Sequence, residues 1–247
     1  MPLPRKLRLT THPIFARVTR WGRLVVFVWL GSVIVFRFIN PPLTPLIGIR
    51  AIEYALRGKP AIPEWDWKPL SYYPIHAQQA VIAAEDSRFM EHWGIDLSAV
   101  EDAIDDSDTR PKPRGASTIT MQTVKNVFLW PGRSYIRKAI EAVMAPIAGI
   151  LWGKRRTLEL YLNVIEWGEG IYGLEAASQY YFKKPASQLS LSESAALASV
   201  LPNPRKLSPR SLTKGAGRRY ERILKEAQAI AIPSQSAARA SYRWRKK

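Results

Sequence analysis

The sequence predicts an all-α protein in which one membrane-spanning helix precedes a single globular domain. Three observations favour this fold class. Apolar residues recur at helical spacing, no alternating apolar and polar run indicates a half-buried strand, and an uncharged apolar stretch, residues 24–36, lies near the N-terminus. With 247 residues, of which 47% are hydrophobic and 23% charged, the chain is long enough for one hydrophobic core.

The membrane anchor is expected at residues 21–39. A hydrocarbon core takes roughly 20 helical residues, so the span must include Trp21, Phe38 and Ile39, while Arg23 and Arg37 extend toward the head groups. No small-residue cleavage site follows, which argues against a cleaved signal peptide.

A basic N-terminus, residues 1–20, precedes the anchor. No acidic residue balances the cations of this segment and of the start of the span. These cations are Arg5, Lys6, Arg8, Arg17, Arg20 and Arg23. The positive-inside rule therefore puts the N-terminus in the cytoplasm and everything after the span outside, on the outer face of the cytoplasmic (inner) membrane.

The rest of the chain is expected to form a linker, a domain and a tail. Prolines at 41, 42 and 45 end the span, and residues 40–74 are interpreted as a membrane-proximal linker with an irregular part from 60 to 74. The domain covers residues 75–232, and a basic tail covers 233–247. Helices are expected around 80–89, over 136–151 with a bend at Pro146, and at 155–165, 170–182, 190–200 and 211–230.

The charge distribution argues against a nucleic-acid enzyme. The net charge of +17 resides at the two ends, with +7 in residues 1–40 and +11 in residues 203–247, which leaves −1 for the domain between them. The chain has no cysteine, so disulfides, thiolate metal sites and a cysteine nucleophile are excluded, and three histidines disfavour a His-rich metal centre.

Two blocks of polar residues are candidates for chemistry. Glu85 and Asp86 end an apolar helical stretch and point about 100° apart, so they need not share a role. Taken alone, they are most simply a solvated helix end. In the second block a small-residue turn opens a helix, with Ser117 and Thr118 as caps. Thr118, Gln122 and Lys125 then line one helical face, which suits a polyanionic ligand.

A basic run surrounds this second block. Residues 110–138 contain seven basic side chains and no acid, which suits a phosphate or diphosphate, although an exposed basic loop explains the run equally well. Glu141 follows as an i, i+4 partner of Arg137. The SxxK sequence at 211–214 is a chance match, because too few residues follow it to build a penicillin-binding domain.

Together these blocks resemble the signature of glycosyltransferase family 51 between about residues 81 and 204. Four ordered motifs carry the resemblance: Glu85-Asp86-x-x-Phe89-x-x-His92-x-Gly94, Gly115-Ala116-Ser117-Thr118-Ile119-Thr120-x-Gln122-x-x-Lys125-Asn126, Arg137-Lys138-x-x-Glu141, and Tyr161-Leu162-Asn163. The short anchored chain is similar to the monofunctional members. Met121 departs from the family, which commonly has a glutamine there.

The resemblance implies a lysozyme-like, two-lobed domain that polymerises lipid II and releases undecaprenyl diphosphate in one inverting displacement. It implies Glu85 as the catalytic base and Glu141 as a second catalytic glutamate that orients a basic side chain or binds diphosphate through a cation. Residues 97–115 would form a mobile flap. The implied substrate-binding residues are Asp86, Phe89, His92, Ser117, Thr118, Gln122, Lys125, Asn126, Arg133, Arg137 and Lys138.

The implied partners are lipid II, the undecaprenyl-diphosphate-linked glycan and the membrane, without nucleic acid. Cell-division or elongation proteins stay open as partners, as does a divalent cation, Mg²⁺ or Mn²⁺, at the diphosphate; no other cofactor is expected. Two alternatives remain: a lysozyme-like hydrolase or lytic transglycosylase that uses Glu85 as general acid, and a membrane-tethered basic adaptor. The basic stripe favours the polymerase, because cleavage of a neutral glycosidic bond has no use for cations around the leaving group.

Overall fold

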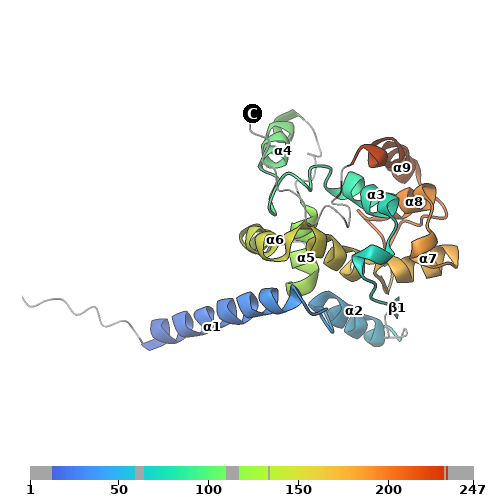
Figure 1. Ribbon diagram of the computed structural model, residues 1–247. Coiled ribbons are helices and arrows are strands. Elements are labelled where there is room, and N and C mark those ends of the chain that lie inside the picture. Colours follow the sequence, from blue (N-terminus) through green and yellow to red (C-terminus); the bar gives the residue numbers. More distant parts are fainter. Residues whose placement is uncertain (1–12, 59–63, 110–116, 133, 231, 233–247) are drawn as a thin grey trace, which may run out of the picture. The chain divides into compact units, whose positions relative to one another are not determined.

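The computed structural model describes residues 13–58, 64–109, 117–132, 134–230 and 232 (Figure 1). Contacts divide the chain into two compact units, residues 1–39 and 40–247. The first unit contains α1 (Pro13–Phe36), and the second contains all other described elements.

Helix α1 is long and apolar enough to cross a membrane. The candidate span is Arg17–Phe36, and apolar side chains such as Val25 and Phe27 are exposed along it. The helix ends at Phe36, three residues before the end expected at Ile39. Residues 37–39 continue only as a turn, because Pro41 disfavours helical geometry at the preceding Asn40.

Residues 40–74, expected as a linker, contain a helix and dock on the domain. Helix α2 (Pro45–Leu56) begins at Thr44, whose side chain accepts a hydrogen bond from Ile47 N, and has Pro45 in its first turn. It packs against α5. Strand β1 (Glu64–Trp65) and the 3₁₀ helix η1 (Leu70–Tyr72) follow, and Trp65 Nε1 donates to Asn163 O at 2.8 Å.

The helices of the second unit form two packed groups (Figure 1). In one, α3 (Ile75–Glu85) packs on α8 (Leu191–Val200) and α9 (Lys214–Glu226). In the other, α5 (Ile119–Phe128) packs along α6 (Tyr135–Val164). The remaining helices are α4 (Leu97–Thr109), α7 (Leu174–Phe182) and the 3₁₀ helices η2 (Ala186–Gln188) and η3 (Ala227–Ala229). The expected all-α class is confirmed.

Two local features differ from expectation. Inside α6 the backbone is non-helical at Gly153, with φ at 69°, rather than at Pro146, so the helices expected at 136–151 and 155–165 are two segments joined at this glycine. A small sheet of order β1-β3-β2 is also present, formed with β2 (Glu166–Gly168) and β3 (Ile171–Tyr172). Strands of two or three residues are too short to produce an alternating pattern.

Candidate active site

Glu85 lies half-buried at the end of α3, where three helices meet. Its Oε2 accepts a hydrogen bond of 2.7 Å from Gln122 Nε2 on α5, and the Tyr161 hydroxyl on α6 donates to Gln122 Oε1 at 3.3 Å. Burial raises the pKa of Glu85 above its usual 4.5, while the Gln122 hydrogen bond and the charge of Lys125 oppose the rise. A carboxylate tuned upward in this way is suited to accept a proton closer to neutral pH.

Asp86 and His92 brace the segment that follows Glu85. Asp86 accepts hydrogen bonds from His92 Nε2 and from the backbone N–H of Ile119, both at 2.9 Å. Gly94 N donates to His92 Nδ1, so the imidazole proton is on Nε2. Thr118, the N-cap of α5, donates to Gly94 O. These bonds join the ends of α3 and α5 and so place Glu85 beside Gln122.

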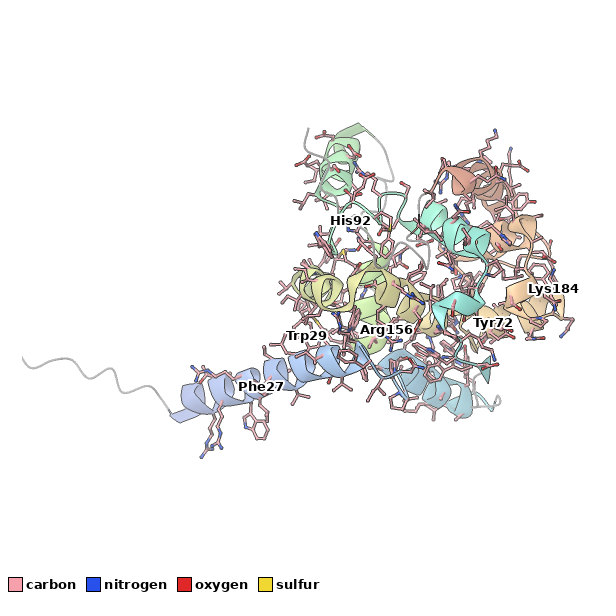
Figure 2. All side chains as sticks on the ribbon, in the orientation of Figure 1. Phe27, Trp29, Tyr72, His92, Arg156 and Lys184 are labelled. Atoms are coloured by element: carbon pink, nitrogen blue, oxygen red, sulfur yellow. The ribbon has the colours of Figure 1, made fainter. Side chains whose placement is uncertain are left out.

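Lys154 is a site residue that sequence reasoning missed. Its ammonium donates to the carbonyls of Phe89 and His92 and lies 4.3 Å from the centroid of the Phe89 ring. Figure 2 labels His92, which lies on the segment after α3. Phe89, expected to bind substrate, is only 1% exposed and lies in the core. In the sequence, Lys154 begins a Lys-Arg-Arg run at 154–156 that is typical of a solvated helix face. The run therefore gave no sign that Lys154 bonds the segment after α3.

Lys125 on α5 and Arg137 and Lys138 on α6 form a cation cluster. Burial lowers the pKa of all three, and the charges of other members lower the pKa of Lys125 and Lys138 further. Lys138 donates to Ser117 Oγ, and Arg137 pairs with the buried Glu141. An excess of positive charge remains, as a polyanion site requires.

Two cavities adjoin these residues. The first, which we call the Glu85 cavity, has a volume of about 560 Å³ and is lined by Glu85, Ser117 and Arg222 among others. The second, the Arg50 cavity, has about 260 Å³ and is lined by Gln122, Lys125 and the buried Asn126, together with residues from α2 and from the loop after α8. Gln122 connects the two cavities, because it lines the Arg50 cavity and donates a hydrogen bond to Glu85, which lines the Glu85 cavity.

Two predicted features fall partly outside the described residues. Arg133, expected at the leaving group, is not among them, and neither are residues 110–116 of the expected flap. The rest of that segment, residues 97–109, is helix α4.

The donor groups in the described part of the chain fit a divalent cation poorly. Asp86, His92 and Asp96 bring ligand atoms within 4.8 Å of one another. However, Asp96 already accepts from Arg88 Nε at 2.9 Å, and Asp86 is fully engaged. In the cation cluster, the carboxylate of Glu141 already forms an ion pair with Arg137. A metal ion at either place would have to displace these partners.

The sequence of the chain is similar to one protein family and to several known proteins. The profile of a protein family described as "Transglycosylase" matches residues 61–228. The chain is 44% identical to a biosynthetic peptidoglycan transglycosylase of Caulobacter vibrioides, over 81% of this chain and 84% of that protein. It is 44% identical to one from Bdellovibrio bacteriovorus, over 85% and 83%, and 41% identical to one from Yersinia pestis, over 77% and 81%.

Proposed function

The chain belongs to the transglycosylase family, and from that premise we propose how it polymerises lipid II into glycan strands. It is a peptidoglycan glycosyltransferase. The donor is the growing glycan held through a polyprenyl diphosphate, and the acceptor is the sugar hydroxyl of lipid II. One observation supports the mechanism. The half-buried carboxylate of Glu85 accepts a hydrogen bond from Gln122 on α5, the helix that also carries Lys125.

Glu85 acts as the base. The acceptor hydroxyl attacks the anomeric carbon of the donor, and its proton passes to the Glu85 carboxylate as the new glycosidic bond forms. The Gln122 amide fixes one carboxylate oxygen and leaves the other for the substrate. The bond between the anomeric carbon and the diphosphate breaks on the opposite side, which inverts the configuration without a covalent enzyme intermediate.

The cation cluster stabilises the leaving group. Negative charge grows on the diphosphate as the bond breaks, and Lys125 and Lys138, both partly desolvated, act on that charge more strongly than they would in water. Protonation of the leaving group is then unnecessary. Glu141 serves as a positioning residue, since its ion pair with Arg137 holds that guanidinium toward the cluster.

Helix α1 anchors the enzyme where both lipid-linked substrates are found. The cations that precede and begin the span support a cytoplasmic N-terminus and a catalytic unit on the outer face of the inner membrane. An anchor of this kind confines the search for substrate to the region near the bilayer.

The test is strand synthesis by the full-length enzyme from purified lipid II in detergent, with penicillin present, followed by gel separation of labelled products. We expect long strands from the wild type and none from Glu85→Gln. A Glu85→Gln enzyme that makes as much polymer as the wild type would remove the base from the mechanism. Cleavage of finished glycan by the wild type, without synthesis, would favour the hydrolase instead.

A further inference from the structure

The Tyr161 hydroxyl lies two hydrogen bonds from the catalytic base and has no role in the mechanism above. It donates to Gln122 Oε1 at 3.3 Å, and Gln122 Nε2 donates to Glu85 Oε2 at 2.7 Å. The three side chains belong to α6, α5 and α3 in that order. Because the first bond is long and the second is short, we expect the tyrosine to influence Glu85 less strongly than the amide does.

The two ends of the Gln122 amide differ in chemistry but hardly in shape. The nitrogen end donates hydrogen bonds, whereas the oxygen end accepts them. Rotated by half a turn, the amide would place its oxygen against the Glu85 carboxylate, and the ionised carboxylate would lose its donor. The orientation of this one amide therefore affects whether the ionised or the protonated form of Glu85 is favoured.

Tyr161 stabilises the amide orientation that favours the ionised form. Its side chain is fully buried, and within the described part of the chain its hydroxyl makes a hydrogen bond to Gln122 alone. With the amide rotated, the hydroxyl proton would face the amide nitrogen, which cannot accept it. A buried donor without an acceptor is unfavourable, so the hydroxyl selects the observed orientation.

The hydroxyl of Tyr161 keeps its proton over the range of pH in which a carboxylate titrates. Burial raises the pKa of Tyr161 well above its usual 10, and the charges of Glu85 and Asp86 raise it further. Tyr161 is therefore a permanent donor. Because it bonds an amide oxygen rather than a titratable group, it takes no part in proton transfer itself.

Three other charges act on the titration of Glu85. Lys125 on α5 and Arg219 on α9 act to lower its pKa, and Asp86, the next residue in the chain, acts to raise it. All three remain when only the hydroxyl of Tyr161 is removed. A change in the titration of Glu85 then reports the link through the amide.

Charged pairs on the walls of the Glu85 cavity also face the carboxylate. Arg88 pairs with Asp96 at 2.9 Å and with Asp102 at 3.8 Å, and Arg222 pairs with Glu226 at 2.9 Å. None of these described pairs includes the tyrosine or the amide, so removal of the hydroxyl leaves them intact.

We propose that Tyr161 is a positioning residue for the catalytic base and acts on it through Gln122. Its hydroxyl holds the amide so that Nε2 donates to Glu85 Oε2, which keeps the carboxylate ionised and leaves Oε1 for the acceptor hydroxyl. The proposal rests on the proposed function, in which the proton of that acceptor hydroxyl passes to Glu85 as the glycosidic bond forms.

Tyr161→Phe tests this role, because phenylalanine keeps the ring that fills the core and removes only the hydroxyl. We expect the acid limb of kcat/KM to move to higher pH by about half a unit and the plateau kcat to fall roughly threefold, while KM for lipid II changes less than about twofold. Initial rates of strand synthesis by the full-length enzyme in detergent, from about pH 4 to 8, give these values. An unmoved limb, or a rise in KM without a shift of the limb, would overturn the proposal.

A double-variant cycle shows whether the effect passes through the amide. When Tyr161→Phe is added to Gln122→Met, we expect no further movement of the limb, because the amide that transmits the effect is already absent. Shifts that add in the double variant would mean that the hydroxyl acts on Glu85 directly, which contradicts the proposal.

Tyr73→Phe is the matched control for loss of a buried hydroxyl. Tyr73 is 2% exposed, and its hydroxyl donates at 3.0 Å to Oδ1 of Asn163, which lies two residues after Tyr161 on α6. This hydroxyl does not bond Gln122, so the limb and the plateau kcat of Tyr73→Phe should match those of the wild type. Equal shifts in the two variants would assign the effect to general loss of packing and reject the positioning role.

A second replacement keeps the test decisive if Tyr161→Phe fails to fold. 3-Fluorotyrosine introduced at position 161 alone preserves the shape of the side chain and makes its hydroxyl a stronger donor, so the acid limb should move to lower pH. An unmoved limb in that enzyme would again overturn the proposal. Absence of polymer from the wild type, or full activity of Glu85→Gln, would instead reject the proposed function.

Discussion

The hydrogen bond from Gln122 to Glu85 sets the pH range in which the carboxylate can accept a proton. It favours the ionised form and so opposes the rise in pKa that burial causes. In Gln122→Met the carboxylate loses this donor, and its pKa rises further. We expect the acid limb of kcat/KM to move to higher pH by roughly half a unit to one unit. Rate measurements from pH 4 to 8 in ~0.5-unit steps check this.

Gln188→Met serves as the control, because Gln188 is exposed on η2 and away from the site. Its pH profile should match that of the wild type. A limb that stays in place in Gln122→Met, or moves to lower pH, would show that the amide does not tune the base.

Lys154 should matter for rate more than for substrate binding. Burial lowers the pKa of its ammonium to about 8, yet the ammonium still holds the carbonyls of Phe89 and His92. In Lys154→Met the segment after Glu85 loses this support, so the carboxylate is less well placed. We expect kcat to fall at least tenfold with a KM within about threefold, measured from initial rates on lipid II.

The neighbouring Arg155 provides the comparison for Lys154. It is exposed, so Arg155→Met should retain wild-type kinetics. Equal losses in the two variants would point to a general effect of charge along α6, and a KM increase without loss of kcat in Lys154→Met would indicate substrate contact instead.

Among the elements, α6 needs a small residue at Gly149, where the segment after α3 packs directly against it. A Cβ added at Gly149 would lie 2.3 Å from the carbonyl oxygen of Trp93, a backbone atom that cannot move freely. Gly149→Ala should therefore push this segment off the helix. We expect a loss of about 1–3 kcal/mol in the free energy of unfolding, together with loss of activity, measured by denaturant titration in detergent.

Gly217→Ala, near the start of α9, tests whether any alanine would have this effect. Its added Cβ meets nothing within 4 Å, so the greater helix propensity of alanine should stabilise the protein by about 0.5–1 kcal/mol. If both variants shift stability in the same direction, the close approach at Gly149 is not the cause.

Helices with long apolar periodicity were predictable, whereas features made by distant parts of the chain were not. Helices α8 and α9 lie within the expected ranges, 190–200 and 211–230. Helix α2 was missed although Thr44 and Pro45 give a start signal, since neighbouring prolines suggested a linker. The family motifs named Glu85 and Gln122 separately, and their hydrogen bond appeared only in the structure, because nothing local brings the end of α3 to α5. In the same way, nothing local brings Arg50 and Arg205 to the same carboxylate, Glu166, across the fold.

For the whole molecule, the strongest expectation concerns orientation in the membrane. The natural chain has no cysteine, so one introduced thiol reports one position. We expect Ser187→Cys, exposed on η2, to react with a membrane-impermeant maleimide in intact spheroplasts, and Thr11→Cys to react only after lysis. Labelling is read on a gel, and the reverse pattern would place the catalytic unit in the cytoplasm.

The crowding of Lys125, Arg137 and Lys138 has a consequence for product release. Charges that draw the diphosphate away from the sugar also retain it afterwards, and until it departs the next donor has no place to bind. Burial lowers the pKa of both lysines, and the charges of neighbouring cations lower it further, so an anion beside them is favourable. Spent carrier lipid should therefore compete with the growing strand, and its removal into the surrounding bilayer becomes part of every cycle of elongation.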